Sequence, residues 1–388
     1  MEKWYVAAKK ADFDKWAKEF HISPVTARIL RNRDLTEESE IQRFLYGKLE
    51  DCYSPWLLKD MDKAVKRINR ALDDGESICI YGDYDCDGVT STALLYTFLS
   101  ALGGFVSYYI PNRATDGYGM NFKAIDKIKA DGTDLIITVD NGISSIEEAE
   151  YIYSLGMQLI VTDHHQIGEN LPRAEAVINP HREDNEIEFR DFAGVGVAFK
   201  LACALYDGDV EDLLEDYADY VTIGTIGDMV PLLNENRAIV KSGLKLINTD
   251  AKIGISALKK STNSKAEHFS ATDVAFQICP RINAAGRMDT ANLAVDLLTC
   301  EDNEIAEYKA EQLNLENTHR HEVEEKIDKD IAEIMANDRA YQTDRVIVVA
   351  GHNYHKGVIG ICAAHLVELY SKPAIVIGID DEGNATGS

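Results

Sequence analysis

The sequence predicts an α/β fold in which a parallel-sheet domain is joined by a long linking helix to a second, smaller α/β domain. From residue 76 onward, short apolar runs alternate with helix-like stretches, which is typical of a parallel sheet covered on both faces. A charged stretch over 303–336 carries only weak helix breakers, so it predicts the linking helix. Strand, helix and strand patterns over 346–379 then begin the second domain. This domain stops abruptly at Ser388, so we expect it to be incomplete and the chain to be truncated.

The elements follow in order along the chain. Residues 1–60 predict an N-terminal helical segment, because SPVTARIL and TEESEIQRFL each begin with a capping residue. The predicted strands are SICIYG, FVSYYIP, TDLIITVDNG, MQLIVTDHH and AVINP. Helices are expected between most of them, and the stretch 195–300 is mainly helical. We therefore predict an N-terminal segment, a sheet domain, a linking helix and a partial second domain at 1–60, 61–302, 303–338 and 339–388.

Composition limits the class of protein. Hydrophobic residues make up 45% of the 388 residues, which favours folded domains, and no apolar run approaches a membrane span. The N-terminus has no secretory pattern, and the seven cysteines form no CxxC pair, so we expect reduced thiols in the cytoplasm and no membrane contact. A net charge of −26 argues against nucleic-acid binding, but net charge describes the whole surface whereas a binding groove is local.

The densest group of acids is the segment DYDCD, which holds Asp83, Asp85 and Asp87. Alternate residues of extended backbone point to one side, so three carboxylates there would repel one another unless a cation lay among them. A calcium loop of the EF-hand type is disfavoured, because its twelfth position would be Leu94 instead of glutamate. A turn of solvated acids is the remaining alternative.

Three further motifs end strands or apolar stretches. Asp140 follows the third predicted strand, the run Asp163, His164 and His165 follows the fourth, and Asp228 lies in an apolar stretch. Each is weak alone, since a single Asp can simply cap a helix and neighbouring histidines are common in surface loops. Ligands of open parallel sheets bind beyond the carboxyl ends of the strands, so these motifs are expected to meet. Carboxylates with one imidazole suit Mn²⁺ or Mg²⁺, and two such ions can clamp a phosphoryl group.

Arginines form the other candidate constellation. Arg281 and Arg287 flank a predicted small-residue turn within Pro280–Met288, and Arg113 follows another strand. Guanidinium groups suit phosphate oxygens, although pairing with nearby surface acids is an equally weighted alternative. The run Gly194–Phe199 begins like a dinucleotide fingerprint but lacks the third glycine and a preceding strand. No Walker lysine motif is present, which disfavours ATP hydrolysis.

Taken in order, DYDCDG, VDNG, DHH and GDMVPL resemble the DHH phosphoesterase superfamily. PRINAAGRM, PNR…GYG and MDKAVKRI narrow the resemblance to the bacterial RecJ family of single-strand-specific exonucleases, across essentially the whole chain. Members are expected to carry a DHH domain, a linking helix and a DHHA1 domain. The segment GVIGICAAHL resembles the start of the DHHA1 domain. Tyr81 stands where the superfamily's pyrophosphatases have histidine, which favours the RecJ branch. The expected glycine-rich DHHA1 motif would begin at about Gly387, and an OB-type domain is absent from the sequence.

The resemblance implies roles for individual residues. Two Mn²⁺ or Mg²⁺ ions are expected on five ligands, with Asp140 between the ions: Asp85, Asp87, Asp140, His164 and Asp228. His165 would contact the scissile phosphate, Asp163 would orient the imidazoles, and Asp83 would support the ligands or add a weak one. Residues expected to hold the DNA are Arg113, Arg281, Asn283, Arg287 and His355.

The implied function is hydrolysis of single-stranded DNA from its 5′ end to 5′-mononucleotides, in repair and recombination. Single-strand-binding protein and a helicase are the implied protein partners. One alternative is a DHH phosphodiesterase acting on short oligonucleotides or cyclic dinucleotides, which PRINAAGRM disfavours. Another is a non-catalytic DNA-binding scaffold, which the complete set of five ligands disfavours.

Overall fold

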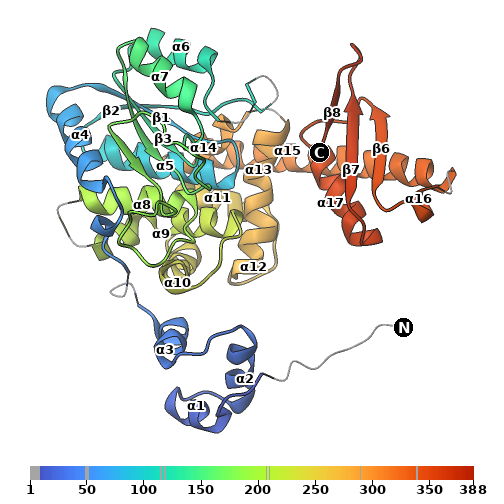
Figure 1. Ribbon diagram of the computed structural model, residues 1–388, viewed down its shortest axis with the longest axis horizontal. Coiled ribbons are helices and arrows are strands. Elements are labelled where there is room, and N and C mark those ends of the chain that lie inside the picture. The colour runs from blue at the N-terminus through green and yellow to red at the C-terminus, as the bar shows by residue number, and fades with distance from the viewer. Residues whose placement is uncertain are drawn as a thin grey trace.

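The computed structural model describes residues 9–48, 52–113, 116–117, 119–206, 208, 210–288, 290–337 and 340–388. In Figure 1 a large α/β body is joined through the long helix α15 (Asn303–Asn337) to a small α/β unit. Three N-terminal helices form a separate small group, which contacts the body where Arg237 Nε donates a hydrogen bond to Phe44 O. The predicted α/β fold with a parallel sheet and a long helix is therefore confirmed. The exact domain limits stay a prediction, and the limit at 338 and 339 lies outside the described residues.

The body is built on a five-stranded parallel sheet in the order β2-β1-β3-β4-β5. The strands are β1 (Ser77–Tyr81), β2 (Phe105–Tyr109), β3 (Leu135–Val139), β4 (Gln158–Thr162) and β5 (Ala176–Ile178). Alternate residues of β1 enter different cores, because successive side chains of a strand point to opposite faces. Ile78 and Ile80 face the core with α5 (Cys86–Ala101), α8 (Gly194–Leu205) and α9 (Val210–Gly227). Cys79 and Tyr81 face the core with α6 (Phe122–Ala130) and α7 (Ile146–Ser154).

The remaining helices of the body surround this sheet. Helix α4 precedes β1 and presents Ala64, Ile68 and Ala71 to the first core. Between α9 and α15 the chain is helical, as the sequence predicts. The bounds are α4 (Met61–Asp74), α10 (Asn234–Thr249), α11 (Ile253–Ser261), α12 (Ala271–Asp273), a π-helical turn (Val274–Ile278), α13 (Cys279–Met288) and α14 (Asn292–Leu298).

Two local predictions are wrong. The acidic segment is not extended throughout, because α5 begins at Cys86, so Asp87 already lies in its first turn. Pro280–Met288 is not a turn: it lies within α13, where the small residues Ala284, Ala285 and Gly286 are buried against neighbouring elements. Small residues permitted close packing here, and the sequence pattern alone does not separate that use from a turn.

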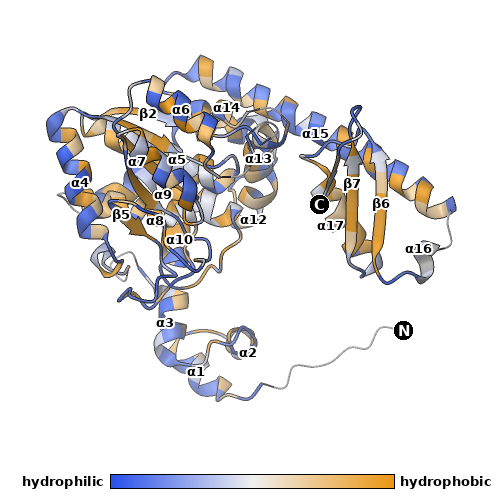
Figure 2. Ribbon diagram, turned by 45° about the horizontal axis from the view of Figure 1, so that its top comes forward, coloured by the Kyte–Doolittle hydropathy of each residue, from blue (hydrophilic) through white to orange (hydrophobic). Residues whose placement is uncertain are grey.

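The small unit has a three-stranded sheet in the order β6-β7-β8. Its elements are α16 (Ala340–Thr343), β6 (Ile347–His352), α17 (Ile359–Tyr370), β7 (Ala374–Ile379) and β8 (Ala385–Gly387). Strands β6 and β7 are parallel and β8 is antiparallel to β7. Ile327 and Ile331 of α15 pack with Val349 and Cys362, so the long helix belongs to this core as well. Figure 2 shows β6 and β7 as largely apolar beside the mixed surface of α15.

The N-terminal helices α1 (Phe13–Glu19), α2 (Pro24–Asn32) and α3 (Glu38–Tyr46) have a core of their own around Trp16, Phe20 and Ile41. The short helix Pro55–Leu57 then leads to α4. Among the described helices, none has the length and apolar character required to cross a lipid bilayer.

Candidate metal centre

The loop after β1 holds the first two predicted ligands. Asp85 is the N-cap of α5, and its Oδ1 accepts hydrogen bonds from the backbone of Asp87 at 2.9 Å and of Gly88 at 3.0 Å. Capping of this kind satisfies amides that have no partner inside the helix. Gly88 is required for the tight turn, since a Cβ there would lie 2.6 Å from Asp83 Cβ. Helix capping, and not strand alternation, therefore fixes the Asp85 carboxylate.

Asp87 is buried, and the start of α8 holds its carboxylate. Oδ2 accepts a hydrogen bond from Gly194 N at 2.6 Å, and Oδ1 accepts one from Val195 N at 2.8 Å. Amides at a helix N-terminus favour an anion. The start of the run that resembles a dinucleotide fingerprint thus binds an anion of the protein itself, through the amides of Gly194 and Val195. Sequence reasoning missed this role, although a glycine at a helix start was the available signal.

Asp140 follows β3 in an unusual backbone conformation. Its φ is +59°, in the left-handed region that Asp and Asn tolerate better than most residues. The next residue fixes this bend, because Asn141 Nδ2 donates hydrogen bonds to Tyr81 O at 3.2 Å and Val139 O at 2.9 Å. The bend keeps the Asp140 carboxylate buried beside α8, where a Cβ on Gly194 would lie only 2.6 Å from Asp140 Cβ.

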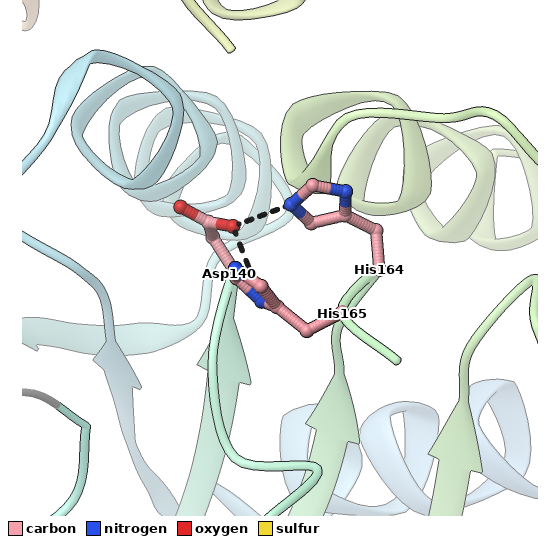
Figure 3. Close-up of side chains that lie close together, drawn as sticks. All are labelled: Asp140, His164 and His165. Carbon is pink, nitrogen blue, oxygen red and sulfur yellow. Dashed lines mark ion pairs between the residues drawn. The ribbon is translucent and has the colours of Figure 1, made fainter. Parts of the chain in front are cut away.

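His164 lies between three acids: Asp140 after β3, Asp87 in the first turn of α5, and Asp228 directly after α9. Its Nε2 is 3.0 Å from Asp140 Oδ1 and 3.7 Å from Asp87 Oδ2, and its Nδ1 is 3.7 Å from Asp228 Oδ2. Figure 3 shows Asp140 and the two histidines converging from β3 and β4. Burial, reinforced by the charge of His165, lowers the pKa of His164 to about 4, so the imidazole is neutral near pH 7. A neutral imidazole has a lone pair available for a metal ion.

His165 has a different environment. Its side chain is 44% exposed, and its Nδ1 lies 2.7 Å from Asp163 Oδ1. This hydrogen bond, with the charge of Asp163, raises the pKa of His165 above its usual value. Burial works to raise the pKa of Asp163, but hydrogen bonds from His165 and from Ile143 N outweigh it and lower that pKa. Asp163 therefore orients one of the two imidazoles, and His165 can present positive charge to an anion.

Buried carboxylates without counterions are the clearest test of whether a metal fits. Burial, followed by the charges of neighbouring aspartates, raises the pKa of both Asp87 and Asp140. The same causes raise the pKa of Asp83 to about 7 and that of Asp228 to about 6. Within the described part of the chain, Asp83 Oδ1, Asp140 Oδ1 and His164 Nε2 are buried without a hydrogen-bond partner. A cation would satisfy these atoms and relieve the repulsion.

The ligand atoms fall into three overlapping groups, within each of which they lie no more than 4.8 Å apart: Asp83, Asp85 and Asp140; Asp87, His164 and Asp228; and Asp140, His164 and His165. Asp140 is shared between two groups and lies beside the third. Oxygen ligands with an imidazole fit divalent ions such as Mn²⁺ and Mg²⁺. The side chains present therefore fit two neighbouring cations, with Asp140 between them.

Three of the predicted substrate-binding residues come together. The Arg113 guanidinium lies 5.2 Å from the centre of the Tyr84 ring, above the metal-site loop. Arg287 Nη1 donates a hydrogen bond to Gly357 O of the small unit at 3.1 Å. Burial lowers the pKa of Arg287 and of His355, and the charge of Arg113 contributes to both shifts. Two arginines of the body thus lie beside an imidazole of the small unit.

Arg281 and Asn283 are hydrogen-bonded to other parts of the protein. Arg281 Nη1 donates to Gln277 O at 2.7 Å, and its Nε donates to Asn314 Oδ1 of α15 at 3.0 Å. Asn283 Oδ1 accepts a hydrogen bond from Cys86 N at 2.7 Å, so it joins α13 to the start of α5. In the GYG motif, Tyr118 lies outside the described residues.

Comparisons with known proteins agree with this architecture. The family model "DHH family, N-terminal domain" matches residues 77–225. The single-stranded-DNA-specific exonuclease RecJ of Bacillus subtilis strain 168 is 41% identical over 371 residues, which cover 95% of this chain and 46% of that protein. A crystal structure of exonuclease RecJ bound to manganese aligns with a TM-score of 0.74 and 33% identity, over 85% of this chain and 82% of that chain. The Mn²⁺ complex of RecJ from Thermus thermophilus aligns with a TM-score of 0.79 and 30% identity, over 97% of this chain and 53% of that one.

The parallel sheet, with its acid and histidine motifs at the carboxyl edge, defines a DHH-type protein. Within that class, the chain belongs to the RecJ family. It spans about half the length of the Bacillus relative that it matches.

Proposed function

We propose that this chain hydrolyses phosphodiester bonds of single-stranded DNA from the 5′ end, using two Mn²⁺ or Mg²⁺ ions, and releases 5′-mononucleotides. The observation that carries the proposal is the overlap of the three ligand groups through Asp140 and His164. Unpaired buried carboxylates in one crevice are costly without a cation, and a pair of cations is suited to phosphoryl chemistry. The RecJ relatives are named as exonucleases specific for single-stranded DNA, which supports this substrate.

Each residue of the centre has a separate task. Asp85, Asp87, Asp140, His164 and Asp228 would hold the ions. When bound, two divalent cations polarise a phosphoryl oxygen and lower the pKa of bound water. The α8 amides orient Asp87, so that its two oxygens cannot rotate away from the centre.

His165 and the basic residues would act on the substrate. Because its pKa is raised by Asp163, His165 presents an imidazolium that stabilises the negative charge developing on the scissile phosphate. Arg113, Arg287 and His355 would bind phosphate oxygens of the strand, and their mutual charge effects support a common position. The polarity of digestion rests on the family relationship alone.

The test uses single-stranded oligonucleotides labelled at the 5′ or the 3′ end, incubated with the purified 388-residue chain and Mn²⁺. Early release of the 5′ label as a mononucleotide supports the proposal, and early release of the 3′ label contradicts the polarity. Asp140→Ala should abolish cleavage and reduce Mn²⁺ binding below two ions per chain. Asp74→Ala, a change of an exposed carboxylate on α4, serves as the matched control.

The alternatives make different predictions. A phosphodiesterase for short oligonucleotides would cleave dinucleotides in preference to long strands. A non-catalytic binding scaffold would bind DNA without cleaving it. We further propose that the protein acts in the cytoplasm with single-strand-binding protein and a helicase. All seven cysteines are free thiols, which supports a reducing compartment. Co-purification with these two partners from the cytoplasmic fraction tests this part of the proposal.

A further inference from the structure

The helix that leads to the metal centre contains a wide turn. In an α-helix the N–H of residue 280 would bond to the carbonyl of Phe276, but Pro280 has no N–H. The backbone widens into the π-helical turn Val274–Ile278. Arg281 Nη1 donates a hydrogen bond to Gln277 O at 2.7 Å. Single π turns inside helices are frequently found at functional sites.

The solvent side of this helix forms one stripe. Pro280, Asn283 and Arg287 share one face of α13 at spacings of three and four, and Thr272 and Phe276 continue the accessible side before and within the π turn. All five are exposed or partly exposed. The stripe reaches the metal centre at its far end, because Asn283 contacts the backbone of Cys86. Figure 1 shows α12 and α13 as one column beside α15.

Two large apolar side chains project into solvent near this stripe. Phe276 is 76% exposed and Met229 is 86% exposed, and Met229 directly follows the predicted ligand Asp228. They flank one packing contact, since a Cβ on Gly227 would lie 3.5 Å from Cys279 Sγ. Both side chains therefore stand uncovered on segments that pack together next to the candidate metal centre.

We propose that Phe276 stacks on a base of the single-stranded DNA as the strand runs from the metal centre along this stripe. The inference rests on the proposed function and deepens it by adding a contact to the bases. An aromatic ring on the same stripe as Arg287 matches the pattern of single-strand-binding surfaces, which combine stacking with phosphate contacts. A protein docked on the stripe would cover the approach to the metal centre, so the substrate strand is the favoured occupant.

The experiment measures the affinity of the 388-residue chain for oligothymidylate in EDTA, where the strand remains intact. Phe276→Ala should weaken binding about 5- to 150-fold, the range expected for losing one stacked base, and Phe276→Trp should retain it. The same comparison is then made with strands that carry a single abasic site at successive positions. When the abasic site lies at the position that faces Phe276, wild type and Phe276→Ala should bind the strand with equal affinity.

Phe105→Ala is the matched control. Phe105 is 69% exposed and begins β2, at the end of the sheet opposite the metal centre, so its loss should leave DNA affinity unchanged. Equal affinity of wild type and a folded Phe276→Ala protein for intact strands would overturn the inference and indicate a protein-binding face. The inference would also be overturned if Phe276→Ala lowered the affinity by the same factor for intact strands and for every strand with an abasic site. If the wild type neither bound nor cleaved single-stranded DNA, the proposed function itself would be contradicted, and this outcome differs from a failure of the inference about Phe276 alone.

Discussion

Replacing Gly194 with alanine should impair the metal centre while leaving the fold intact. A Cβ at this position would lie 2.6 Å from Asp140 Cβ and 2.9 Å from Asp140 Oδ1. Carbon atoms at optimal contact are ~3.5–4.0 Å apart, so Asp140 or the start of α8 must move by about 1 Å. Gly194 N also donates to Asp87, and therefore the same movement disturbs a second predicted ligand.

The size of the effect follows from that displacement. A shift of about 1 Å in a catalytic group can cost about 10²-fold in rate. Loss of a contact that orients metal ligands typically costs about 10- to 100-fold in metal affinity. The unfolding free energy should change less, because alanine gains up to ~1 kcal/mol of helix propensity against an overpacking cost of ~1–3 kcal/mol. We expect a folded Gly194→Ala protein with weak Mn²⁺ binding and about 1% of the wild-type cleavage rate.

Three measurements on one preparation distinguish these effects: calorimetric titration with Mn²⁺, initial rates on single-stranded DNA, and urea unfolding in EDTA. Gly196→Ala is the matched control, since it makes the same change two residues later in α8. Its Cβ would meet the Phe192 ring at 3.3 Å, a contact that a small ring movement relieves, and it would touch no predicted ligand. A Gly194→Ala protein with wild-type Mn²⁺ affinity and rate would refute the assigned role of Asp140.

Further outcomes are expected from the charges around the centre. Because the pKa of Asp83 is raised to about 7 and that of Asp228 to about 6, Mn²⁺ must displace protons, so its affinity should rise from pH 5 to pH 8. The same raised pKa values stabilise the metal-free fold at low pH, and this stabilisation should be lost as the pH rises through about 6 to 7, as urea unfolding in EDTA would show. Asp163→Asn should lower the pKa of His165 and shift the alkaline limb of the rate profile to lower pH. Arg281→Ala should reduce the salt slope of single-strand binding by about 0.7 if it contacts one phosphate.

Each outcome has a result that contradicts it. Mn²⁺ affinity that is constant from pH 5 to pH 8, or metal-free stability that does not fall over this range, would mean that the aspartates carry no protons in the metal-free site. If the alkaline limb of the rate profile is unchanged in Asp163→Asn, the protonation of His165 does not control the rate-limiting step. An unchanged salt slope in Arg281→Ala would assign that arginine to its bonds with Gln277 and Asn314 alone.

The α/β class and the parallel strands follow from the sequence alone. Apolar β-branched runs such as Leu135–Val139 can be buried on both faces only within a covered parallel sheet, so their pattern is decisive. The motifs at the ends of these strands then had to share one edge of the sheet. Local pattern and global fold agree in these segments, and this agreement made the prediction possible.

The way in which the ligands are held depends on tertiary contacts. The anchoring of Asp87 by α8 joins residues 107 positions apart in the chain, and no local pattern reports such a contact. The left-handed bend at Asp140 depends on Asn141 reaching Tyr81 on a neighbouring strand. The helix that replaces the expected turn at Pro280–Met288 depends on packing around small residues. Sequence periodicity specifies which faces are buried, whereas the orientation of each ligand depends on contacts between segments distant in the chain.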